Sequence, residues 1–147
     1  MIEVRHDRTV AAPRSAVWAV LSRFDRIAEW ATAVDHSSLL TATRTGLGAT
    51  RRIQVASMVL IEEVTEWEPE TRLAYSLQGL PPLVRSAVNE WGIEAEGQAS
   101  RVSLTAHVMP GPRPPTRIAA RVLARRLGAT NAGLLADLVH TVEGTTP

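Results

Sequence analysis

The sequence has 147 residues, of which 45% are hydrophobic and 21% are charged, and its formal net charge is +1 at pH 7. This composition is sufficient for a buried core, and the small net charge excludes a protein built to wrap nucleic acid. The absence of cysteine excludes disulfides, thiolate metal sites and a cysteine nucleophile. We expect residues 1–147 to form a single domain.

The amino-terminal segment "MIEVRHDRTV" alternates charged and aliphatic residues and lacks the apolar core of a signal peptide. No apolar run in the sequence approaches the roughly 20 residues that a membrane-spanning helix needs. We therefore expect a cytoplasmic protein without stable membrane insertion.

The chain is predicted to open with one strand and two short helices. The strand covers Ile2–Val10, and Pro13 ends it and suits the first turn of a helix whose apolar stripe begins at Val17. Asp25 is a candidate cap for the second helix, which runs to about Trp30.

Strand patterns recur from His36 onward, separated by turn residues such as Gly46 and Gly48. Their spacing is typical of an antiparallel sheet. The six segments are "HSSLLTAT", "ATRRIQV", "MVLIEEVTEW", "LAYSLQG", "SAVNEWGIEAEG" and "RVSLTAHV".

The carboxy-terminal part of the chain predicts one long helix. Four prolines within residues 109–116 end the sheet, and the proline-free stretch from Arg117 to about Glu143 carries apolar residues at helical spacing. Gly128 and Gly133 weaken the middle of this helix, where a kink could form.

Strand alternation places polar side chains on otherwise aliphatic rows in four of the strands. These side chains are Arg51, Glu62, Tyr75 and Asn89, and Trp91 shares the row of Asn89. A mostly apolar pocket with a few convergent polar groups is typical of a small-molecule site. The five residues are therefore our candidate ligand-binding set. A catalytic set cannot be assigned, and Glu62 is its best single candidate.

The hairpin between the third and fourth strands adds a specific pairing. A tight turn centred on Ala56 and Ser57 would place Arg51 directly opposite Glu62 on the inner face, with Glu63 on the outer face. This pair could polarise a ligand or transfer protons, or it could be a partly buried structural ion pair, which we favour. The arginine would also favour the ionised form of the carboxylate.

The remaining candidate residues have both functional and structural interpretations. Tyr75 and Trp91 could stack on a ring-shaped ligand or simply fill the core, which is the commoner case. A buried Asn89 needs hydrogen-bond partners and is therefore more informative. The histidines show no metal-ligand spacing, so we expect neither a metal site nor another cofactor.

An arginine row follows one side of the long helix. Arg117, Arg121 and Arg125 are spaced four residues apart, and Arg126 adjoins them. The row could meet an anionic membrane or a phosphorylated partner, or it could be the solvated face of an amphipathic helix, which we favour.

The order of these elements and their local amino-acid sequences resemble those of a known superfamily. The segment "TVAAPRSAVWAVLSRFDRIAEW" resembles the opening of the START/Bet v 1-like (SRPBCC) superfamily, in its polyketide cyclase/dehydrase and lipid-transport branch. The segments "GLGATRR", "EEVTEWEPETRLAYSLQG" and "LLADLVHTVEG" are also similar to their counterparts there. The resemblance implies the helix-grip fold, an α+β architecture in which a curved seven-stranded antiparallel sheet wraps around a long carboxy-terminal helix.

The resemblance also implies a cavity between the sheet and the helix. Our first hypothesis is a protein that binds a small hydrophobic, lipid- or polyketide-like molecule there. The alternative is an enzyme of the polyketide aromatase/cyclase or dehydratase type, and a weaker one is a protein-interaction module. We expect no nucleic-acid partner, and the sequence leaves open whether the chain forms a homodimer.

Overall fold

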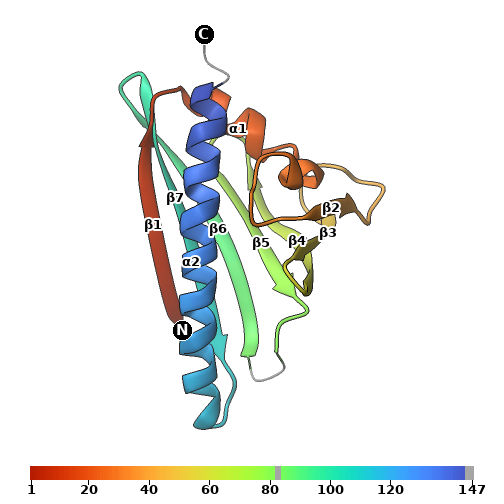
Figure 1. Cartoon of the computed structure of the whole chain (residues 1–147). Coiled ribbons are helices and arrows are strands. Elements are labelled where there is room, and N and C mark those ends of the chain that lie inside the picture. Colours follow the sequence, from red (N-terminus) through yellow and green to blue (C-terminus); the bar gives the residue numbers. More distant parts are fainter. Residues whose placement is uncertain (82–83, 145–147) are drawn as a thin grey trace.

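The computed structural model describes residues 1–81 and 84–144, which form one sheet, two short helices and one long helix (Figure 1). The elements are β1 (Ile2–Val10), α1 (Arg14–Leu21), the 3₁₀ helix η1 (Phe24–Glu29), β2 (His36–Leu39), β3 (Thr50–Val55), β4 (Met58–Glu68), β5 (Arg72–Gln78), β6 (Val84–Glu96), β7 (Ala99–Pro110) and α2 (Pro115–Gly144).

The seven strands pair in the antiparallel order β1-β7-β6-β5-β4-β3-β2, so the first strand lies beside the last. The sheet curves around α2, which runs along its inner face (Figure 1). This arrangement confirms the predicted helix-grip fold. A bulge in β4, where the pairing with β5 shifts between Val64 and Glu66, adds to the bend of the sheet.

The core lies between the concave face of the sheet and α2. The inward side chains of β7 from Val102 to Val108 are fully buried, as expected from their unbroken apolar alternation. The helix packs mainly on β7 and β1, and only lightly on β6. Gly128 permits this close approach, because a Cβ atom there would lie only 2.6 Å from Cγ1 of Val4.

Two details of the helices differ from the sequence-based expectation. The long helix begins at Pro115 and runs through Gly128 and Gly133 without interruption, so no kink forms there. Asp25 lies inside η1 and provides no side-chain cap, because the residue that precedes the helix is Arg23.

The short helices close one end of the sheet through buried side chains and aromatic contacts. Phe24 and Ile27 of η1 are buried, and Phe24 meets Tyr75 of β5 edge to face, with ring centroids 5.6 Å apart. Trp30 likewise contacts Trp91 of β6, with centroids 6.3 Å apart. The sequence region between β1 and β2 therefore forms one wall of the interior.

Candidate functional site

A cavity of about 140 Å³ lies between η1, strands β3 to β5 and α2. Most of its lining is aliphatic and includes Ile27, Leu60 and Leu134. Met58 and Arg126 line it at their solvent-exposed ends and mark its mouth. The cavity therefore lies on the side of α2 away from the tight contact with β1.

The predicted pairing of Arg51 with Glu62 is present and buried. The two residues are register partners across β3 and β4, and each is only 3% exposed. The turn between the strands is made possible by Ala56, which adopts a left-handed φ of 54° that fits a tight hairpin. Strand alternation and turn position were therefore sufficient to find this pair.

The arginine is held by three kinds of contact. Its Nε and Nη2 atoms each lie 2.8 Å from Oε1 of Glu62, and Nη1 donates a 2.7 Å hydrogen bond to the carbonyl of Phe24. The guanidinium also lies over the rings of Phe24 and Tyr75, at 3.8 and 4.7 Å from their centroids. A buried guanidinium with this many partners has little freedom to reorient.

Only one of the two carboxylate oxygens of Glu62, Oε1, takes part in this ion pair. Among the described residues, none hydrogen-bonds to Oε2, and the side chain lines the cavity. Burial raises the pKa of Glu62 above its usual value of 4.5, and the charge and hydrogen bonds of Arg51 offset this only in part. Arg51 favours the ionised carboxylate, as expected from the sequence, but desolvation has the larger effect on the pKa of Glu62.

Tyr75 lines the cavity and forms a buried pair with Trp91, which lies behind it. The indole Nε1 of Trp91 donates a 3.3 Å hydrogen bond to the hydroxyl of Tyr75. Burial raises the pKa of the Tyr75 hydroxyl, with a further contribution from the charge of Glu62, so it stays a neutral phenol. The hydroxyl can therefore act as a hydrogen-bond donor toward the cavity.

A reciprocal amide pair joins the sheet to the long helix. Asn131 of α2 donates from Nδ2 to Oδ1 of Asn89 at 2.9 Å, and Asn89 returns a longer contact of 3.4 Å. Both side chains are buried and both line the cavity. The need of Asn89 for a partner was predicted, but its partner was not identified. The signal for Asn131 was an amide within an otherwise aliphatic helical stripe.

Three of the five candidate residues line the cavity, namely Glu62, Tyr75 and Asn89. Arg51 and Trp91 do not line it, because they lie behind Glu62 and Tyr75 and hold these two side chains in place. The expectation that all five would face the pocket was therefore wrong for these two. Sequence reasoning missed the polar side chains that the helix contributes to the lining, which are Arg126, Thr130 and Asn131.

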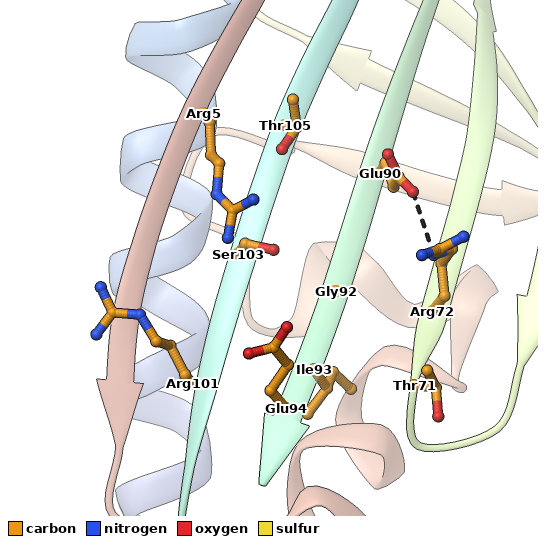
Figure 2. Close-up of a pocket in the computed structure, with 10 residues that line it drawn as sticks. All are labelled: Arg5, Thr71, Arg72, Glu90, Gly92, Ile93, Glu94, Arg101, Ser103 and Thr105. Atoms are coloured by element: carbon orange, nitrogen blue, oxygen red, sulfur yellow. Dashed lines mark ion pairs between the residues drawn. The ribbon is translucent and has the colours of Figure 1, made fainter. Parts of the chain in front are cut away.

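A second hollow, of about 290 Å³, lies on the outer face of the sheet over Gly92 (Figure 2). It is polar, and its arginines already have carboxylate partners: Arg72 pairs with Glu90 at 3.2 Å, and Arg5 and Arg101 both pair with Asp7. Although this hollow is larger than the inner cavity, each of its three arginines is already paired with a carboxylate. We therefore take the inner cavity as the candidate site.

The described part of the chain contains no group of three or more histidine, aspartate or glutamate side chains suited to hold a metal ion. Within residues 1–81 and 84–144, no helix combines the length and the apolar character needed to cross a membrane.

Comparisons with solved structures show the same fold. The chain matches the Zhui aromatase/cyclase from Streptomyces sp. R1128 with a TM-score of 0.78 and 20% identity, over 97% of this chain and 93% of that one. It matches a START superfamily protein from Mycobacterium smegmatis with a TM-score of 0.77 and 19% identity, over 98% and 99% of the two chains. Ara h 8.0201 matches with a TM-score of 0.73 and 10% identity, over 98% and 99%.

Among curated protein sequences, no significant match is found. The family model described as "Polyketide cyclase / dehydrase and lipid transport" matches residues 1–143. The superfamily resemblance in the sequence is thereby confirmed: the chain belongs to the polyketide cyclase/dehydrase and lipid transport family.

Proposed function

We propose that this protein binds a small, mainly apolar molecule in the cavity between β3–β5 and α2, with one polar group of the ligand placed against Glu62. The observation that carries the proposal is the second carboxylate oxygen of Glu62, which is left without a protein partner beside an apolar cavity. A carboxylate oxygen that faces a mostly apolar cavity can gain a hydrogen bond from a ligand that enters it.

The size of the cavity limits the ligand. An engineered apolar cavity of about 150 Å³ holds one benzene molecule, and drug-sized ligands need about 300 Å³ or more. At about 140 Å³, the cavity suits a single ring or a short branched chain. A longer tail would have to extend past Met58 and Arg126 at the mouth. This favours a small ligand over a fused polyketide skeleton.

The polar groups favour a ligand with a hydroxyl-type group at its buried end. Above the raised pKa of Glu62, Oε2 accepts a hydrogen bond, and the neutral hydroxyl of Tyr75 can donate one. A phenol or enol can both donate and accept. The two side chains together therefore complement such a group.

A second candidate function is an acid–base reaction of the cyclase or dehydratase type on such a ligand. The raised pKa of Glu62 favours it, since a carboxyl group whose pKa is nearer to neutrality can exchange a proton more readily. The neighbouring Tyr75 hydroxyl would stabilise an enolate oxygen as the proton leaves.

Two matched probes test the binding proposal: phenol, which can donate a hydrogen bond, and toluene, which has the same shape and cannot. Calorimetric titration should give a phenol-to-toluene affinity ratio that falls about tenfold in the double variant Arg51→Met/Glu62→Leu, because a hydrogen bond to a charged group is lost. Replacing both members of the pair avoids leaving a lone buried charge.

The exposed, outward-facing Glu63→Gln is the control and should leave the ratio unchanged. An unchanged ratio in the double variant would contradict the role of Glu62, and failure of both probes to bind would contradict the cavity as a ligand site.

Glu62→Gln separates binding from catalysis. If the protein is an enzyme, this variant should bind the molecule that co-purifies with the wild type, identified by native mass spectrometry, and fail to convert it. If the bound molecule is chemically unchanged after prolonged incubation with the wild type, the protein binds this molecule without converting it.

A further inference from the structure

The first half of α2 and the segment just before it carry an unbalanced positive charge. Residues 97–136 contain no aspartate or glutamate, and the exposed arginines of this stretch include five within fourteen positions. Unlike Arg5, Arg72 and Arg101 on the outer face of the sheet, none of the five has an ion-pair partner within residues 1–81 and 84–144. They are Arg113, Arg117, Arg121, Arg125 and Arg126.

These arginines lie where they do not help the helix itself. The amino-terminal end of a helix is the positive end of its dipole and favours acidic residues, yet the first turn of α2 has none. Arg117, Arg121 and Arg125 also repel one another at a spacing of four residues. Local stability therefore does not explain the row, and an anionic partner would.

Aliphatic side chains accompany the charges on the same exposed surface. Ile118 is 69% exposed and Val122 is 47% exposed, and they lie one helical turn apart, next to the arginine row. In Figure 1 the first turns of α2 extend past the start of β1, so this surface lies at one end of the molecule. We name it the docking face; it comprises Arg117, Ile118, Arg121, Val122, Arg125 and Arg126.

The docking face adjoins the mouth of the inner cavity. A shallow apolar depression beside Val122 shares Pro81, Leu123 and Arg126 with the cavity. An apolar molecule leaving the cavity would therefore meet apolar side chains of this depression next to the docking face.

We propose that the docking face binds reversibly to an anionic membrane surface. Cationic side chains attract anionic headgroups, while neighbouring aliphatic side chains enter the boundary between headgroups and acyl chains. The docking face has no aromatic residue on which a nucleic-acid base could stack, which favours a lipid surface over a single-stranded nucleic acid. This inference goes beyond the proposed ligand binding and does not depend on it.

Co-sedimentation with vesicles tests the proposal. Vesicles of phosphatidylcholine with 30% phosphatidylserine should bind the protein at low salt, while pure phosphatidylcholine vesicles should bind it far less. High salt should release the protein, because it screens exposed charges. The triple variant Arg117→Gln/Arg121→Gln/Arg125→Gln should weaken partitioning by about fivefold per arginine, on the order of a hundredfold in all.

Two further variants make the test specific to this surface. Ile118→Ser/Val122→Ser should weaken binding while leaving the net charge unchanged. Arg8→Gln/Arg23→Gln/Arg44→Gln removes the same charge from exposed positions elsewhere and should retain binding at or close to the wild-type level. All replaced side chains are exposed, and thermal unfolding of each variant verifies that it folds.

Equal loss in the two triple variants would overturn the proposal, because net charge alone would then account for the binding. Binding to polyglutamate or single-stranded RNA without binding to anionic vesicles would overturn it in favour of an acidic macromolecule.

Discussion

Arg51 directs two nitrogen atoms at the same oxygen of Glu62, each at 2.8 Å, and leaves the other oxygen to the cavity. The pair therefore has a structural role and also leaves one hydrogen-bond acceptor free for a ligand. Oε1 neutralises a buried guanidinium, and Oε2 remains available to a ligand.

Breaking this pair from either side should destabilise the protein, and unequally. Arg51→Met leaves a carboxyl whose raised pKa lets it become neutral, whereas Glu62→Leu leaves a buried guanidinium that cannot lose its proton. We expect losses of about 3 kcal/mol for the first and about 4 kcal/mol for the second, and recovery of most of this in the double variant. Urea unfolding followed by tryptophan fluorescence gives the full cycle. Additive losses would mean that the two side chains are not coupled.

The stability of the wild type relative to Glu62→Gln should fall with rising pH. The pKa of Glu62 is higher in the folded protein than its usual value of 4.5, so the folded state binds its proton more tightly than the unfolded chain does. The contribution is therefore fully present below about 4.5 and is lost as the pH rises through the folded-state pKa. Urea unfolding of both proteins at several values from pH 4 to pH 8 measures the difference. A difference that grows with pH would show that Arg51 outweighs burial.

The two glycines in the middle of α2 should respond oppositely to alanine. Gly128→Ala places a Cβ atom 2.6 Å from Cγ1 of Val4, which forces the helix away from β1, and we expect a loss of about 1–3 kcal/mol. Gly133→Ala meets nothing within 4 Å and should stabilise the helix by about 0.5–1 kcal/mol. Thermal unfolding of the two variants makes the comparison. A stabilising Gly128→Ala would mean that the helix can shift on the sheet at little cost.

The stabilities of variants at Asn89 and Asn131 should not be additive, because each side chain is the hydrogen-bond partner of the other. Asn131→Leu removes the partner that Asn89 has in the helix, and the unsatisfied buried amide should cost about 1–3 kcal/mol. Replacing both asparagines by leucine removes the unsatisfied groups and should recover much of that loss. Chemical denaturation of both variants measures it. A double variant less stable than Asn131→Leu would indicate that Asn89 finds other partners when alone.

The sequence was sufficient to predict those contacts that depend only on a single strand or on two strands joined by a short turn. The register of β3 and β4 follows from strand alternation and a short turn, so Arg51 and Glu62 could be paired without a structure. The apolar row of β7 was equally readable, because every second residue from Val102 to Val108 is hydrophobic.

The helix side of the cavity could not be derived in this way. Which face of α2 meets β6 depends on how the helix is rotated and seated, and this is fixed by distant contacts such as Gly128 against Val4. The pairing of Asn131 with Asn89 is a consequence of that seating. The direction of the pKa shift of Glu62 likewise depends on the complete three-dimensional enclosure, not on the neighbouring charge alone.

The close packing of α2 on one side of the sheet affects which residues of the cavity can be substituted without loss of the fold. The helix is fastened to β1 and β7, while the chamber borders β3, β4 and β5. Substitutions at Leu60 or Leu77 can thus reshape the chamber while the contacts that seat the helix stay in place. The strands that hold the helix are therefore largely different from those that shape the chamber, and β6 contributes to both, through Asn89.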